Sequence, residues 1–306
     1  MMKGNRISLK QKKWRNWDLY LMLVPVILFY LVFHYAPMYG VQIAFKDFMA
    51  SKGIWGSPWV GFKYFEKFFS SYYFERLLYN TISISFSQLL FGFPIPIILA
   101  LMVNELKNGP FKKCVQNITY APHFLSVVVL VGIVINFLNS ERGIINHLIN
   151  LFGGQSIDFL TEPQWFKPIY IISEVWQNTG WNSIIYISAL AGIDPQLHES
   201  AKIDGAGRFA RIIHINIPSI LPTIVILLIL NAGQIMNVGF EKVFLLQNDL
   251  NRSASDVIST FSYSIGIQGG QYSFASAIGL FNSIINFILL LFVNKLSKKL
   301  TETSLW

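Results

Sequence analysis

The stretch ESAKIDGAGRFARIIHINIP, residues 199–218, is a short charged segment between two long apolar runs. The run before it covers approximately residues 166–191, and the run after it covers residues 219–240. Each run has about the 20 residues that a helix needs to cross a hydrocarbon layer roughly 30 Å thick. The stretch is therefore predicted to be a polar loop fixed between two membrane spans.

The composition of the whole chain also indicates an integral membrane protein. Hydrophobic residues make up 53% of its 306 residues and charged residues only 13%, whereas a soluble domain carries about a quarter charged residues. The apolar runs are continuous, unlike the alternating segments of a β-barrel, and helices satisfy their own backbone groups in lipid. We therefore predict an all-α polytopic fold with six transmembrane helices, at approximately Asp18–Pro37, Leu77–Asn104, Cys114–Leu138, Phe166–Ala191, Ser219–Phe240 and Tyr272–Asn294.

The distribution of basic residues predicts the orientation. Six spans place both chain ends on one side of the membrane with the loops at 105–113 and 194–217, and 15 of the 24 Lys and Arg residues lie there. The positive-inside bias predicts that this side faces the cytoplasm and that the protein lies in the cell (inner) membrane. The net charge of +8 thus reflects topology and not nucleic-acid binding. The expected parts are a basic cytoplasmic tail at 1–17, a six-helix transmembrane domain at 18–294 and a cytoplasmic tail at 295–306.

The loop at 194–217 is predicted to form a helix-turn-helix elbow. Asp194 can cap a helix that begins at Pro195, a position where the missing N–H costs nothing. Gly205 allows the chain to reverse, and residues 208–216 can form a second short helix before Pro218 opens the next span. The exposed face mixes apolar and charged side chains, a composition suited to the groove of a partner.

The spacing of residues in this loop resembles the coupling loop of binding-protein-dependent ABC importer permeases. The family pattern is Glu-Ala-Ala, three residues, Gly, nine residues, Ile, one residue, Leu and Pro. This chain has the same order from Glu199 to Pro218, with Ser200 in place of the first Ala and Ile217 in place of Leu. Both changes conserve size.

The resemblance implies a type I importer permease fold whose cytoplasmic coupling helix inserts into an ATPase subunit and transmits its ATP-driven closure to the membrane. The alternative is an ordinary amphipathic loop on the membrane surface. No glycine-rich loop ending in Gly-Lys-Ser or Gly-Lys-Thr occurs in the chain. We therefore expect a transporter subunit that is not an enzyme and binds no cofactor, with ATP and Mg used by separate chains. The residues expected to contact the ATPase are Glu199, Ser200, Ala201, Asp204, Gly205, Arg208 and Phe209.

The resemblance extends over essentially the whole chain and is most specific for the carbohydrate, maltose-permease-like type, in the subgroup that imports complex oligosaccharides and polysaccharide fragments. It implies a second, related permease subunit, two ATPase subunits, and a solute-binding protein on the outer side of the membrane. The segments that carry it are WDLYLMLVPVILFYLVFHYAPMYGVQIAFKDF (17–48), GSPWVGFKYFEKFF (56–69), LLFGFPIPIILALMVNEL (89–106), YAPHFLSV (120–127) and GWNSIIYISALAGIDPQLHESAKIDGA (180–206).

Two stripes of polar residues in the outer half of the spans independently favour a sugar path. Polar side chains inside a span are costly and normally face a bundle interior or a watery cavity. Residues four apart share a helix face, and neutral amides beside a Trp ring suit sugar hydroxyls and apolar sugar faces. The predicted path residues are Glu174, Gln177, Asn178, Trp181 and Asn182 on the fourth span and Asn231, Gln234 and Asn237 on the fifth. Weaker candidates are Asn80, Ser83, Ser87, Gln88, Asn282 and Asn286.

Other interpretations of these residues stay open. The amides can instead join helices by hydrogen bonds worth on the order of 0.6 to 2 kcal/mol each, and Glu174 can be either a cargo ligand or a solvated residue at the outer interface. The cargo can also be a peptide or an organic anion, against which we count the scarcity of basic residues inside the spans. A membrane sensor or scaffold that uses the elbow only for binding is the more distant alternative, and the polar stripes argue against it.

Overall fold

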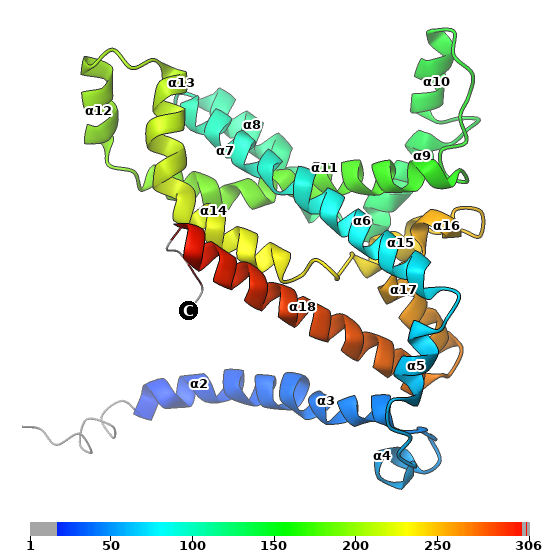
Figure 1. Ribbon diagram of the computed structural model, residues 1–306. Coiled ribbons are helices and arrows are strands. Elements are labelled where there is room, and N and C mark those ends of the chain that lie inside the picture. The colour runs from blue at the N-terminus through cyan, green and yellow to red at the C-terminus, as the bar shows by residue number, and fades with distance from the viewer. Residues whose placement is uncertain (1–16, 302–303, 305–306) are drawn as a thin grey trace, which may run out of the picture.

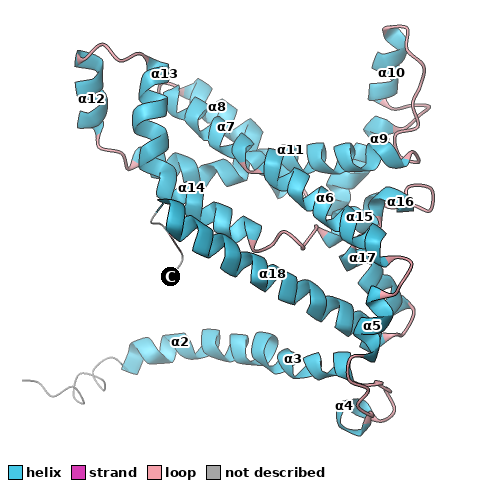
Figure 2. Cartoon of the chain, in the orientation of Figure 1, coloured by secondary structure: helices cyan, strands magenta, loops and turns pink. Residues whose placement is uncertain are grey.

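The computed structural model describes residues 17–301 and 304. The described residues form helices joined by loops, as Figure 2 shows, and contain no β-strand, only one isolated bridge between Lys46 and Trp59. The prediction of an all-α fold is therefore confirmed. Apart from Trp17, the expected basic tail at 1–17 lies outside the described residues.

Each of the six predicted spans corresponds to a helical segment. Among the described residues, four segments are long and apolar enough to cross a membrane alone, and a fifth qualifies if two helices bent against each other count as one span. The remaining one is the fourth predicted span, α11 (Pro163–Ala191). Its 29 residues are long enough, but polar side chains interrupt its apolar surface. The four segments are Leu19–Phe45, Phe74–Glu105, Arg208–Ala232 and Tyr272–Lys299, and the bent pair is Pro110–Phe124 with Val127–Leu138.

The helical elements follow one another with short connections (Figure 1). Those of the first half are α2 (Trp17–Tyr30), η1 (Leu31–Tyr35), α3 (Ala36–Met38), η2 (Tyr39–Phe45), α4 (Gly53–Gly56), α5 (Lys63–Phe69), α6 (Phe74–Gly92), α7 (Pro94–Glu105), α8 (Pro110–Tyr120), η3 (Ala121–Phe124), α9 (Val127–Leu138) and α10 (Ile144–Leu151). After α11 come α12 (Pro195–Ile203), α13 (Arg208–Arg211), η4 (Ile212–Asn216), α14 (Ile217–Ala232), α15 (Phe240–Leu246), α16 (Arg252–Ser255), α17 (Ile258–Tyr263), η5 (Ser264–Gln268) and α18 (Tyr272–Thr301).

Helix α11 runs through the centre of the bundle and contacts α6, α7, α8, α14 and α15. Near its start, Phe166 and Tyr170 are buried in an apolar cluster with residues of α6, α9 and α15. Near its end, Tyr186 and Leu190 are buried in a second cluster with residues of α7 and α14. Because both clusters include α11, this helix fixes the positions of the elements on either side of it.

The third predicted span is not one continuous helix. Its two parts meet at an angle of 102° between Phe124 and Val127. Pro122 lies in the tight turn η3, and Leu125 and Ser126 have extended backbones. The Ser126 hydroxyl accepts the Val129 N–H at 3.3 Å and so begins α9 afresh. The third span, predicted from Cys114 to Leu138, is therefore a bent pair of helices.

The fifth span differs from the prediction at both ends. The helix is continuous from Arg208 to Ala232, so the expected separate short helix at 208–216 does not form. A wide π-helical turn, η4, precedes Pro218. It accommodates the Pro218 ring, which would clash with the preceding turn of an α-helix. At the other end α14 stops at Ala232 instead of reaching Phe240, and residues 233–239 are non-helical.

Helix α2 stands apart from the other helices (Figure 1). None of the described side chains of α2 and η1 is buried, although the segment is strongly apolar. In contrast, η2 at the end of this segment packs against α18, and Ala44 is fully buried there. The first span is therefore attached to the bundle by its last turns alone and offers the rest of its length to lipid or to another chain.

At Gly180 the backbone of α11 lies directly against the backbone of α8. A Cβ atom at this position would lie 2.0 Å from the Thr119 carbonyl oxygen and 2.9 Å from the Tyr120 nitrogen. Both are backbone atoms, so a side chain here would force the helices apart. A small residue that lets two backbones approach is a common device in membrane helix packing.

We predict that Gly180→Ala separates α11 from α8 and destabilises the folded chain, since overpacking typically costs about 1–3 kcal/mol. Gly279→Ala on α18 is the matched control, because no atom lies within 4 Å of the Cβ position there. Thermal unfolding of the detergent-solubilised protein should show a lower midpoint for the Gly180 variant and an unchanged or higher one for the control. Equal midpoints would refute the packing role.

Candidate functional site

The loop at 194–217 forms a capped helix followed by a glycine reversal. The Asp194 carboxylate accepts the Gln196 N–H at 2.9 Å, and Pro195 is the first residue of α12, as predicted. The helix ends at Ile203, and Gly205 has a φ of +78°, which favours glycine. The Ala206 N–H then donates a hydrogen bond to the Ala201 carbonyl oxygen at 2.8 Å, which closes the end of the helix.

The predicted coupling residues lie on this projecting elbow, which Figure 1 shows at the edge of the molecule. All are exposed except Ala201, which is half-buried. The apolar side chains of Ile203 and Phe209 are 86% and 74% exposed, next to the charged Glu199 and Arg208. Large apolar side chains exposed beside charges are typical of a docking surface.

A polar cavity of about 130 Å³ lies between α6, α11 and the end of α14. Six of the eight predicted path residues line it, and Gln88 from the weaker candidates joins them. A second cavity of about 90 Å³ is lined in part by the same residues and extends along α7 and α14. The six are Glu174, Asn178, Asn182, Asn231, Gln234 and Asn237.

The stripe on α11 shares one face, as its spacing predicted. Glu174, Asn178 and Asn182 all line the cavity, and the Asn178 amide donates to Glu174 Oε1 at 2.6 Å. Gln177 and Trp181 do not line it. Gln177 is buried, and its amide donates to the Leu125 carbonyl at the bend of the third span. Trp181 stacks on the His123 ring with 4.5 Å between centroids, and His123 Nδ1 lies 3.0 Å from Asn178 Oδ1, so Trp181 is connected to the amides through His123.

The expected helical stripe on the fifth span does not form. Only Asn231 lies on α14, whereas Gln234 and Asn237 lie on the non-helical segment 233–239. Amide side chains of α18 replace part of the lost helical bonding: Asn286 Oδ1 accepts the Met236 N–H at 2.9 Å, and Asn282 and Asn286 both donate to Asn237 Oδ1 at 3.0 Å. Irregular backbone at membrane depth is tolerated where it lines a cavity or is buried in protein.

The far end of the segment 233–239 is attached to α11. The Gly239 N–H donates to the Tyr170 hydroxyl at 3.1 Å, and the Tyr170 side chain is fully buried. The segment is therefore held between α18 and α11, with Gln234 and Asn237 exposed toward the cavity. Asn282 and Asn286 have the helix-joining role that was the alternative interpretation of these amides.

Lys242 is a buried residue beside the cavity that the sequence interpretation missed. It was placed in an outer loop, but it is only 3% exposed and donates to Glu174 Oε2 and, at 2.8 Å, to Gln177 Oε1. Lys167 lies within the fourth span itself and was overlooked. The predicted spans therefore contain one lysine, Lys167, and Lys242 of α15 adds a second basic side chain beside the cavity. The available signal was Glu174, because a carboxylate at membrane depth needs a cationic partner.

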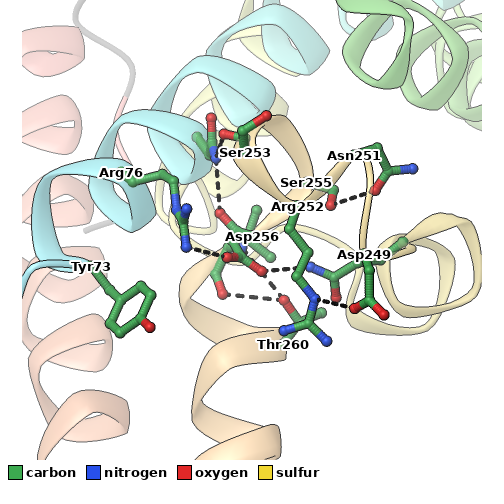
Figure 3. A network of polar contacts seen from close by, with 12 residues as sticks. Tyr73, Arg76, Asp249, Asn251, Arg252, Ser253, Ser255, Asp256 and Thr260 are labelled. Atoms are coloured by element: carbon green, nitrogen blue, oxygen red, sulfur yellow. Dashed lines mark hydrogen bonds and ion pairs between the residues drawn. The ribbon is translucent and has the colours of Figure 1, made fainter. Parts of the chain in front are cut away.

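Asn80 belongs to the packing of the loop at 247–257 and not to the cavity. Its amide donates to the carbonyls of Ser253 and Asp256 at 3.0 and 3.1 Å. Beside it, Arg76 of α6 pairs with the Asp256 carboxylate at 2.7 Å (Figure 3). Burial raises the pKa of Asp256, and the Arg76 guanidinium counteracts that rise. These contacts fasten the segment 252–257 to the start of α6.

Comparison with protein families gives one match that covers most of the chain. Residues 85–302 match the model of the binding-protein-dependent transport system inner membrane component. The chain belongs to this family. The matched region includes α11, α12, α14 and α18, so the elbow and the polar cavity of this binding-protein-dependent permease both lie inside the family domain.

Two relatives of the permease come from Bacillus subtilis. Protein LplB is 44% identical, with 98% of this chain and 93% of LplB covered. The polygalacturonan/rhamnogalacturonan transport system permease protein YteP is 43% identical, with 98% and 92% covered. Among solved structures, a bacterial ABC transporter involved in the import of the acidic polysaccharide alginate matches with a TM-score of 0.88 at 43% identity, covering 96% of this chain and 99% of that one. The type I ABC importer permease fold expected from the sequence is therefore confirmed.

We predict that Asn286→Leu weakens the permease more than Asn282→Leu. The Asn286 change removes the bond to Asn237 and leaves the buried Met236 N–H without a partner, at a cost of about 1–3 kcal/mol. The Asn282 change removes only an exposed bond to the same oxygen. Thermal unfolding in detergent measures the difference, and an equal effect of the two changes would contradict the anchoring of the segment 233–239.

Proposed function

We propose that this permease imports oligosaccharides, with acidic ones among them, by ATP-driven alternating access in a complex with other chains. The single observation that carries the proposal is the amide-lined cavity, where amides of α11 meet those of Asn231 on α14 and of the segment 233–239. Amide groups both donate and accept, as sugar hydroxyls require. The relatives support the cargo class, because YteP is a polygalacturonan and rhamnogalacturonan permease and the structural match imports alginate.

A second permease subunit is proposed as the other wall of the path. Asn182, Asn231, Gln234 and Asn237 are all exposed in the single chain, although they lie at membrane depth. Amides facing lipid would be costly, so this side requires a water-filled space closed by another chain. Helix α2, unburied along its length, provides an apolar surface against which such a partner can pack. The sister chain is inferred to be a related permease.

The remaining partners follow from the two ends of the molecule. Two ATPase subunits are proposed to receive the elbows of the permease pair, with Glu199, Arg208 and Phe209 in the contact. We infer that the elbow and both termini face the cytoplasm, as the basic residues indicate. On the outer side we propose a solute-binding protein, because a similar structure is that of an alginate transporter in complex with an alginate pentasaccharide-bound periplasmic protein.

The test of the cargo path is oligosaccharide uptake. We expect the double change Asn178→Leu and Asn231→Leu to lower uptake about tenfold, since two lost hydrogen bonds are worth about 1.4 kcal/mol or more. Asn136→Leu on α9 is the matched control: Asn136 and Asn231 each donate at 2.8 Å to the carbonyl four residues earlier, but Asn136 does not line the cavity. Assembly with the ATPase should persist in both. Unchanged uptake, or loss of assembly with loss of uptake, would favour helix joining as the role of these amides.

The coupling role predicts a difference between two neighbouring glycines. Gly205→Val should reduce the sugar transported per ATP hydrolysed, because a β-branched residue at a φ of +78° is strained by about 1–2 kcal/mol and shifts the end of α12. Gly207→Val is the control, since Gly207 has a φ of −68° and open space at its Cβ position. Gly205→Asn should retain more coupling than Gly205→Val, because Asn tolerates the left-handed region. If both valine variants transport normally, the elbow is not the coupling element.

A further inference from the structure

A buried lysine lies directly behind the wall of the polar cavity. Lys242, in the first turn of α15, donates its ammonium protons to Glu174 and to Gln177, and its nitrogen lies 5.9 Å from the centre of the Tyr170 ring. Only 4% of the Lys242 side chain is exposed. Its charge is therefore directed at α11 and away from solvent.

Glu174 is in contact with both the lysine and the cavity. One carboxylate oxygen pairs with Lys242, and the other accepts the Asn178 amide at 2.6 Å. A fifth of the Glu174 side chain is exposed, and it is the only charged residue among the described residues that line the two polar cavities. The cavity wall thus carries one negative charge with a positive charge immediately behind it.

This pairing matters for some cargoes and not for others. A lone carboxylate in a narrow cavity attracts cations and repels anions. A neutral sugar is not affected by this charge, and its hydroxyl groups can donate hydrogen bonds to the carboxylate oxygens. Cancelling the charge therefore changes transport only when the cargo is itself charged. Lys167, two turns earlier on α11, donates to the Ser83 hydroxyl at 2.7 Å and lies over the Tyr79 ring. Lys167, Lys242 and Glu174 by themselves carry one net positive charge, and Glu241 beside Lys242 on α15 is exposed.

We propose that Lys242 is a specificity-determining residue that neutralises Glu174 and so admits oligosaccharides carrying carboxylates, that is, uronate chains. The inference rests on the proposed function, because it assumes that the amide-lined cavity carries the cargo. Lys242 acts through Glu174 and does not itself contact the sugar. The pair of Lys242 and Glu174 thereby determines which charge of cargo the amide-lined cavity accepts.

The first experiment measures the electrostatic potential in the cavity without any sugar. Cys114 is the only cysteine, so a Cys114→Ser background with Asn231→Cys places a single thiol at the wall shared by both cavities. The full-length chain, in its membrane with its partners, is treated with an anionic and a cationic methanethiosulfonate reagent. The ratio of the two modification rates reports the local charge.

In this background Lys242→Met should lower the anionic-to-cationic rate ratio about tenfold, equivalent to about 1.4 kcal/mol. The double change Glu174→Gln with Lys242→Met should return the ratio close to that of the unchanged pair, and Lys242→Arg should preserve it. Lys167→Met serves as the matched control with a smaller effect. A thiol at Phe152, which is 91% exposed on an outer loop, should give a ratio that none of these changes alters.

Three outcomes of the thiol assay would overturn the proposal. The first is an unchanged ratio in the Lys242→Met variant. The second is a double variant as low as the single one, which would show that the effect does not act through Glu174. The third is a cavity thiol that neither reagent modifies, because the path would then not be open to charged solutes. The double and Arg variants keep the test decisive if the single variant fails to fold.

The second experiment measures the cargo class. Uptake of galacturonate and mannuronate trimers is compared with uptake of their methyl esters, which have the same sugar rings without the charge. Lys242→Met should reduce acid uptake at least tenfold more than ester uptake. An equal loss for acids and esters overturns the specificity role. If the rate ratio shifts as expected but the unchanged protein takes up neither acids nor esters, the cargo assignment fails while the charge compensation stands.

Discussion

The need to satisfy polar groups at membrane depth governs this structure. Helix α14 ends inside the span, and the seven residues 233–239 that follow it form turns with only a few backbone hydrogen bonds. They persist because Asn286 of α18 binds the Met236 N–H and Tyr170 of α11 binds the Gly239 N–H. These contacts create the cavity, since they hold Gln234 and Asn237 open toward Asn178 and Asn182.

The same constraint explains the charged pair. A carboxylate at membrane depth is stable only with a cation or water beside it, and Glu174 has Lys242 on one side and the cavity on the other. Gln177 extends this network to the Leu125 carbonyl, at the 102° bend of the third span. Helix α15, the central helix α11 and the bend are thereby joined by hydrogen bonds and not by apolar packing alone.

The two ends of the molecule are built for different kinds of contact. The elbow is stabilised locally, by the Asp194 cap and the reversal at Gly205, and exposes its apolar side chains. A rigid element with an exposed docking face can transmit a push from a partner to α14, with which it is continuous through η4. The cavity lies at the other end of α14. One helix therefore connects the proposed motor contact to the proposed path.

The sequence by itself determined the all-helical membrane fold, the elbow with its cap and its glycine, and the face shared by Glu174, Asn178 and Asn182. Each depends on local chemistry or on helical periodicity, which short stretches of sequence contain. Only the tertiary structure decided the bend of the third span, the unwinding after Ala232 and the partner of Glu174. The last two depend on side chains about 50 to 70 residues away, such as Asn286 and Lys242. The hydropathy of the sequence identifies such residues as polar, but it does not identify the distant group with which each forms a hydrogen bond.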